Sequence, residues 1–367
     1  MIGIDQARSF CGISFLKCSF RRLWRDSQTS VFAPTRHGTG TFHGEHGMIQ
    51  TRVAFDRDKV KQTVSKLAER GVYLGTSSWK YAGWRGMLYD ESRYVWRGRL
   101  SESRFEKLCL AEYAEVFKTV SVDAAYYRFP DRRYIEGLVS QVPCDFQFAL
   151  KVTDEITIRK FTKLARFGPR AGKPNEHFLN ADLFVSDFLA PCEPFKKSIG
   201  LLMFQFSHFY PEDFARGRDF VEALGGFLEK LPKGWPYGVE IRNRYFLKEE
   251  YFATLARHGV AHIYNSWADM PPVDEQLALP GSRTRPDFFS VRFQLRPGRK
   301  YEDAVKLFRP YDRVKDPYPE GRAAASKVIQ EGMRAGKKTR AFIYVNNRFE
   351  GNALETIDAV LDEVIEG

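Results

Sequence analysis

The sequence is poor in cysteine, with five residues in 367 and no CxxC pair. An odd number of widely spaced cysteines argues against a disulfide framework and favours a reducing compartment. We therefore expect a cytoplasmic protein whose cysteines are ordinary thiols. They are Cys11, Cys18, Cys109, Cys144 and Cys192.

Long apolar runs are also absent. No uninterrupted apolar stretch approaches the about 18 residues that a membrane helix requires, so we predict a soluble protein without a membrane partner. With 43% hydrophobic, 15% aromatic and 28% charged residues, the composition is that of a globular chain with a sizeable core.

Histidine is scarce, with seven residues, and no HxH or HExxH pattern occurs. Metal-dependent barrels need several histidines and carboxylates at successive strand ends. His208 and His262 alone lie near predicted strands, and the apolar surroundings of His262 favour a packed core residue. No P-loop, GxSxG or dinucleotide fingerprint is present. We predict no metal and no cofactor.

Acidic residues fall short of basic ones, 46 against 57, which gives a net charge of +11. A basic surface attracts phosphates, nucleic acid or anionic substrates. Alternatively, the excess charge is spread over solvated helix faces. The composition leaves both interpretations open.

Residues 1–48 differ from the rest in having little hydrophobic periodicity and a Gly/His-rich stretch at 35–47. Three interpretations compete: a transit peptide, a disordered basic arm, or upstream sequence before a true start at Met48. We favour the third. The folded domain is then expected over residues 55–366.

Short β-branched or aromatic runs alternate with helical patterns from residue 55 onward. Eight such runs predict a single (β/α)8 TIM-type barrel, with residues 1–48 as a flexible N-terminal extension. A doubly wound open sheet is the rival, but the turn after the first run is GTSSWKYAG, not GxGxxG. The predicted strands are 72–77, 119–130, 146–152, 200–206, 237–243, 261–267, 288–294 and 340–347.

Charged residues within apolar strands are informative because an unpaired buried charge is costly. In a barrel the strand ends converge on one mouth, where active sites lie. We predict Glu240, Asp123 and Lys151 as catalytic residues, with Glu240 or Asp123 as acid/base and Lys151, Arg242 and Arg292 as charge stabilisers. A ring of structural ion pairs is the alternative.

Other residues at the predicted strand ends are candidates for ligand binding. Aromatic side chains after the first two strands suit a stacking wall, or else they plug the mouth. The predicted ligand-binding residues are Thr76, Ser77, Trp79, Tyr127, Arg128, Arg242, Arg292, Gln294, Tyr344, Asn346 and Asn347.

Six segments in order carry a family resemblance: GTSSWKYAGWRGMLY, FKTVSVDAAYYRFP, FQFALKVTDEIT, LLMFQF, VEIRN and YVNNRFEGNALE. Together they resemble the domain of unknown function 72 family over Val72 to about Ile365. The resemblance implies a TIM barrel without fixing a reaction. Asp123 stands where a Glu is usual, Gln294 where a His is usual, and NNRFEG replaces an NNTANG-like turn, which indicates a divergent member.

From these observations we predict an enzyme that acts on a small anionic ligand, phosphorylated or sugar-like, at the C-terminal face of the barrel. The alternative is a nucleic-acid-binding or nuclease-related protein using the basic surface, the 153–175 loop and the aromatic wall. A non-catalytic scaffold is the third hypothesis. Salt discriminates the first two, because nucleic-acid binding weakens steeply as salt rises.

Overall fold

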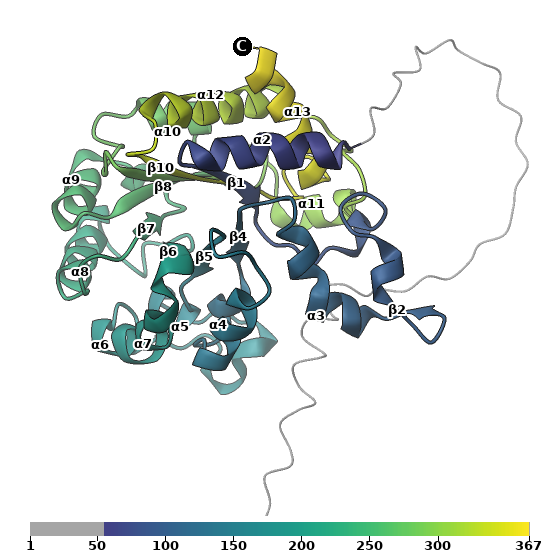
Figure 1. The fold of residues 1–367 in the computed structure, drawn as a ribbon. Helices are drawn as coiled ribbons and strands as arrows, with labels where there is room; N and C mark the ends of the chain where they lie inside the picture. Colours follow the sequence, from purple (N-terminus) through teal and green to yellow (C-terminus); the bar gives the residue numbers. More distant parts are fainter. Residues whose placement is uncertain (1–54, 367) are drawn as a thin grey trace, which may run out of the picture. The chain divides into compact units, whose positions relative to one another are not determined.

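The computed structural model describes residues 55–366, in which eight parallel strands close into a barrel (Figure 1). Around the barrel the strand order is β1, β10, β9, β8, β7, β6, β5, β4. The predicted TIM-type barrel is therefore confirmed, and the expectations for residues 1–48 lie outside the described residues. The barrel strands are β1 (Val72–Thr76), β4 (Thr119–Val122), β5 (Gln147–Lys151), β6 (Ile199–Gln205), β7 (Tyr237–Glu240), β8 (Ala261–Ser266), β9 (Phe288–Phe293) and β10 (Arg340–Val345).

Helices occupy the connections and cover the outside of the barrel (Figure 1). Several of these helices begin after a polar N-cap residue. The Asp56 carboxylate accepts from the backbone N–H of Lys59 at the start of α2, and the Asp131 carboxylate accepts from that of Tyr134 at the start of the helix after β4. The longer helices are α2 (Arg57–Glu69), α3 (Glu102–Tyr113), α4 (Arg132–Val139), α8 (Gly217–Glu229), α9 (Glu249–His258), α11 (Tyr301–Phe308), α12 (Pro319–Ala335) and α13 (Ala353–Glu366). The shorter ones are α5 (Asp154–Thr157), α6 (Ala181–Leu183), α7 (Ala190–Cys192) and α10 (Val273–Ala278).

A hairpin of β2 (Val95–Trp96) and β3 (Arg99–Leu100), in the connection between β1 and α3, was not predicted from the sequence. Its four strand residues are exposed, so it lacks the buried alternation that identifies a strand in a sequence. Residues 162–172 group separately from the barrel. Taken alone, they contain a 3-10 segment (Ala165–Arg170) broken at Gly168, whose φ is 50°.

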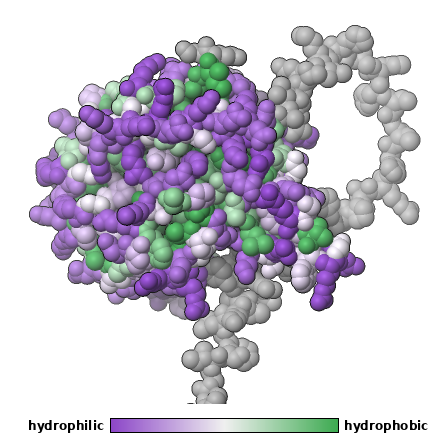
Figure 2. Space-filling model, in the orientation of Figure 1, coloured by the Kyte–Doolittle hydropathy of each residue, from purple (hydrophilic) through white to green (hydrophobic). Residues whose placement is uncertain are grey.

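Two packed regions result from the alternation of side chains along each strand. Outward-facing residues such as Val239 and Val291 pack against the helices, while inward-facing residues such as Met203 and Phe342 fill the barrel. The face in Figure 2 is mostly hydrophilic, with small scattered hydrophobic patches. Within residues 55–366 no helix is both long and apolar enough to cross a membrane.

The cysteines in the described part of the chain, Cys109, Cys144 and Cys192, are free thiols. Burial raises the pKa of Cys109 and that of Cys192 to about 12. Neither buried thiol is therefore activated as a nucleophile at neutral pH, in line with the prediction that the cysteines are ordinary thiols.

The lack of a side chain at Gly75 lets β1 lie close to its neighbour β4. A Cβ added there would lie 2.2 Å from the carbonyl oxygen of Thr119, a backbone atom that cannot turn away. We expect Gly75→Ala to lower the free energy of unfolding by about 1–3 kcal/mol, as overpacking does. Gly226→Ala, on the exposed side of α8 with nothing within 4 Å, is the control and should be neutral or stabilising. Urea unfolding measures both, and an unchanged Gly75→Ala would contradict the close packing.

Candidate functional site

The last inward-facing position of every barrel strand is polar. Because inward positions alternate, the interior residues Met203 and Tyr344 are followed two residues later by Gln205 and Asn346. These terminal positions lie at the carboxyl ends of the strands, which is the functional face of such barrels. The residues are Ser77, Asp123, Lys151, Gln205, Glu240, Asn265, Arg292 and Asn346.

Glu240 is the centre of this polar layer and is fully buried at the end of β7. Its Oε2 accepts from Nη1 of Arg292 at 2.5 Å, and its Oε1 accepts from Nε of Arg242 at 3.2 Å. Burial by itself would raise the pKa of Glu240, but the two guanidinium groups overcome this effect and hold the pKa below its usual value. Glu240 is therefore a carboxylate at neutral pH.

Arg292 is fixed on several sides. Besides Glu240, it donates to Oε1 of Gln205 at 3.0 Å. The amide of Gln294, with its oxygen turned to the guanidinium, accepts from Nη1 at 2.6 Å. Arg292 is 3% exposed, so these contacts hold it as a rigid counter-ion for Glu240.

Arg242 has a more open position than Arg292. Its guanidinium lies 3.5 Å from the ring centroid of Trp267, and its side chain remains 12% exposed. The pKa of Arg242 is lowered, first by burial, although Glu240 counteracts this. A guanidinium stacked on an aromatic ring keeps its outer edge available for a carboxylate or phosphate.

Lys151 ends β5 with its Nζ 4.0 Å from the ring centroid of Tyr126 and 3.9 Å from a carboxylate oxygen of Asp123. The side chain of Lys151 is 11% exposed. Burial lowers its pKa to about 8, with Arg292 and Arg242 adding to the shift and Asp123 opposing it. Lys151 can therefore gain or lose a proton near neutral pH, as a general acid or base must.

Arg348 is a cation at the mouth that the sequence reasoning missed. Its guanidinium lies 4.7 Å from the ring centroid of Tyr301, which in turn packs against Trp267 at 6.2 Å. In the described part of the chain no carboxylate lies within 4.0 Å of Arg348. The replacement of an NNTANG-like turn by NNRFEG was the available signal, because it puts an arginine directly after the asparagine pair that follows β10.

The aromatic ring in contact with Lys151 belongs to Tyr126, which is not among the predicted ligand-binding residues. Tyr126, 7% exposed, lies under the ammonium, while the predicted Tyr127 is 56% exposed and Arg128 is exposed as well. Trp79 is 5% exposed, so its ring faces are covered by protein and offer no open stacking wall. Ser77 and Asp123 each retain a buried oxygen with no hydrogen-bond partner among the residues described.

The side chains of three predicted ligand-binding residues make contacts within the fold. The Thr76 hydroxyl donates to the carbonyl of Ser78 at 2.7 Å, which fixes the turn after β1. Tyr344 is fully buried and its hydroxyl lies 2.9 Å from that of Thr119, the first residue of β4, so it fills the barrel interior. The Asn347 side chain accepts from the backbone N–H of Ala353 at 2.7 Å and caps α13. These contacts give all three a structural role.

Metal ligands do not gather here. Across residues 55–366, no three His, Cys, Asp or Glu side chains are close enough to hold a metal ion. His262 is fully packed as expected, and burial lowers its pKa to about 3. The mouth combines amides, a buried carboxylate and several cations, which suits an anionic or hydroxylated organic ligand.

The model of the family described as Protein of unknown function DUF72 matches residues 73–366. Solved DUF72 structures share the fold. One from Enterococcus faecalis V583 is 17% identical at a TM-score of 0.54, covering 81% of this chain and 96% of its own. Another from Thermotoga maritima MSB8 is 22% identical at a TM-score of 0.51, covering 81% and 99% respectively. No curated protein matches the chain.

Proposed function

We propose that this chain, which belongs to the DUF72 family, is an enzyme that binds a small anionic ligand, phosphorylated or sugar-like, at the mouth of its barrel. One observation carries the proposal: cations outnumber carboxylates around the mouth. The cations are Lys151, Arg242, Arg292 and Arg348, and the carboxylates are Glu240 and Asp123. Repulsion between cations in a partly buried site falls when an anion binds there.

The role of each residue in this proposal follows from how accessible its side chain is. Arg292 keeps Glu240 ionised and in place. Arg242 and Arg348 flank the Trp267–Tyr301 pair and are the groups that meet the anionic end of the ligand. Lys151 transfers the proton, since its pKa of about 8 lies near the working pH. Asn346 and Gln205 are suited to hydrogen bond with hydroxyl groups.

The cellular setting belongs to the same proposal. Free thiols among the described cysteines and the low cysteine content favour a reducing compartment, and we assign the protein to the cytoplasm. Fractionation of cells that express the full chain tests this assignment, which fails if the protein is recovered outside the cytoplasmic fraction.

Ligand binding is tested by titrating the full chain calorimetrically with a panel of sugar phosphates and hydroxy acids at constant ionic strength. We expect Lys151→Met to weaken the best ligand by at least about tenfold, the equivalent of one hydrogen bond to a charged group. Lys107→Met, an exposed lysine on α3, is the control and should bind like the wild type. Affinity should also fall as pH rises through about 8, because Lys151 then loses its charge.

Two outcomes would reject the small-ligand enzyme. Equal binding by Lys151→Met and the wild type would remove Lys151 from the site. Binding of oligonucleotides alone, indifferent to Lys151→Met and abolished by salt, would support the nucleic-acid alternative that the net charge of +11 allows.

A further inference from the structure

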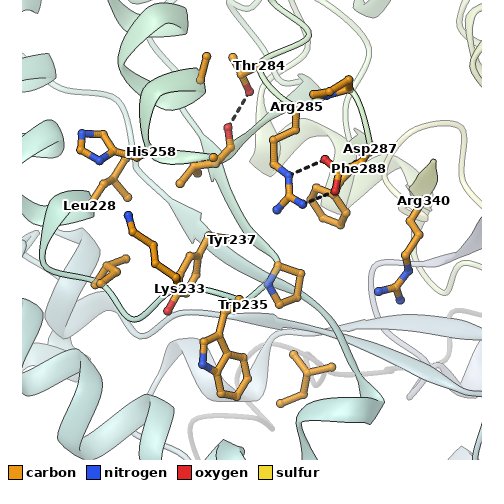
Figure 3. Close-up of a pocket in the computed structure, with 18 of the residues that line it drawn as sticks. Leu228, Lys233, Trp235, Tyr237, His258, Thr284, Arg285, Asp287, Phe288 and Arg340 are labelled. Atoms are coloured by element: carbon orange, nitrogen blue, oxygen red, sulfur yellow. Dashed lines mark hydrogen bonds and ion pairs between the residues drawn. The ribbon is translucent and has the colours of Figure 1, made fainter. Parts of the chain in front are cut away.

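A hollow of about 680 Å³, whose lining is drawn in Figure 3, lies where the barrel strands begin, at the opposite end from the mouth. Its walls include the first residues of four barrel strands, whereas the mouth is built from the last. Those first residues are Ile199 of β6, Tyr237 of β7, Phe288 of β9 and Arg340 of β10. The loops that precede these strands supply most of the remaining lining.

The lining is strongly basic. Of the described residues that form it, five are cations and one is a carboxylate. The cations are Lys196, Lys197, Lys233, Arg285 and Arg340, and the carboxylate is Asp287. Arg285 is neutralised, because its Nε and Nη2 donate to Asp287 at 3.0 and 2.6 Å (Figure 3).

Three of the cations have no such partner. In residues 55–366 no carboxylate lies within 4.0 Å of Lys197, Lys233 or Arg340. Lys196 approaches the exposed Glu193 at 3.9 Å and lies 4.6 Å from the ring centroid of Trp235. The hollow therefore concentrates positive charge that the protein itself does not balance.

Stability does not account for this cluster, since like charges in one concavity repel each other. Arg340 is nevertheless held in place. Its Nη2 donates to Oε1 of Gln147 at 2.5 Å, and its guanidinium lies 5.4 Å from the Tyr73 ring and 5.0 Å from the Phe342 ring. A guanidinium fixed by neutral groups and turned toward a hollow is suited to an external anion.

We propose that this hollow binds a small polyanion with two anionic groups, such as a molecule with two phosphates. Figure 3 shows Lys233 and Arg340 on opposite sides of the hollow, so that one ligand can meet both. One group contacts Lys233 and the other contacts Arg340, while Lys197 adds its positive charge to the same lining. This site is separate from the mouth and does not depend on the function proposed there.

The size and walls of the hollow favour a small molecule over nucleic acid. Its volume falls in the range of about 300–1,000 Å³ that is usual for small-ligand pockets. The aromatic side chains in the lining, Trp235, Tyr237 and Phe288, are at most 5% exposed. They offer no open ring face on which a base could stack, as single-stranded nucleic acid requires.

Calorimetric titration of the full chain with inorganic pyrophosphate, at constant ionic strength, tests the site. We expect the double variant Lys197→Gln/Lys233→Gln to bind at least about tenfold more weakly than the wild type, because it removes two positive charges from the lining. The control Lys66→Gln/Lys107→Gln removes the same charge from exposed positions on α2 and α3 and should bind like the wild type. Lys197→Arg/Lys233→Arg should retain binding.

Misfolding is distinguished by thermal unfolding without ligand, where Lys197→Gln/Lys233→Gln should be at least as stable as the wild type because repulsion is relieved. The proposal is overturned if the wild type fails to bind pyrophosphate, or if the control variant loses as much affinity. It is also overturned if Lys151→Met abolishes pyrophosphate binding while the double variant retains it, which would locate the anion at the mouth. Binding of oligonucleotides but not of pyrophosphate would replace it with a nucleic-acid surface.

Discussion

Glu240→Gln should lower the free energy of unfolding by about 3–5 kcal/mol, the range found when one partner of a buried ion pair is removed. The variant keeps the shape of the side chain but leaves Arg292 and Arg242 without their carboxylate. Urea unfolding of the full chain measures the loss. Glu115→Gln is the matched control. It breaks ion pairs to Arg57 and Arg93 at the surface, where the loss should stay within about 1 kcal/mol.

Added anions should restore part of this stability. With its internal carboxylate gone, the cationic cluster of Glu240→Gln should bind phosphate or citrate more tightly than the wild type does, and the unfolding temperature should rise more steeply with anion concentration. Chloride at equal ionic strength controls for screening. A variant as stable as the wild type, or one that anions do not affect, would show that Glu240 is not the counter-ion of the arginines.

At acid pH the difference in the free energy of unfolding between Glu240→Gln and the wild type should disappear. The pKa of Glu240 is lowered in the folded chain, so its stabilising effect is complete above the unfolded value of about 4.3. As pH falls below that value and through the lower folded pKa, the folded state must take up a proton and the effect is lost. Above about pH 5 the difference between the two proteins should therefore stay constant.

The barrel and the centre of the mouth could be predicted from the sequence because both depend on alternation. Glu240, Lys151 and Arg292 each stand in an apolar strand, where a charge must be paired or functional. The same rule explains the misplacement of Tyr344, which is one inward layer below Asn346 and therefore bonds to Thr119 inside the barrel. A sequence pattern identifies the face of a strand but not the depth of a side chain.

Features built by loops could not be predicted in this way. Arg348 lies in the turn after β10, and its position depends on a backbone conformation that no periodicity encodes. The basic hollow was even less predictable from the sequence. Lys196, Lys233 and Arg340 are far apart in the chain, and closure of the barrel brings the loops before their strands together. In the sequence they were indistinguishable from the general excess of positive charge.

Lys151→Met should stabilise the fold at pH 7, because it removes a buried ammonium whose pKa falls from 10.5 to about 8. A shift of this size corresponds to about 3 kcal/mol of unfavourable burial. Between pH 8 and 10.5 the unfolded wild type binds more protons than the folded one, so its stability rises with pH. The advantage of the variant over the wild type should thus shrink by about 3 kcal/mol across this window.

Unfolding free energies of Lys151→Met and the wild type at pH 7 and pH 10.5 measure this change, with the exposed Lys107→Met as the control whose difference from the wild type should not depend on pH. An advantage of Lys151→Met that is the same at both pH values would mean that the ammonium keeps its ordinary pKa and is solvated. Lys151 could then not act as the proton donor of the mouth. If the advantage shrinks as expected while ligand binding is lost, Lys151 destabilises the fold at neutral pH and supports binding at the mouth. A residue retained for packing alone would not show that combination.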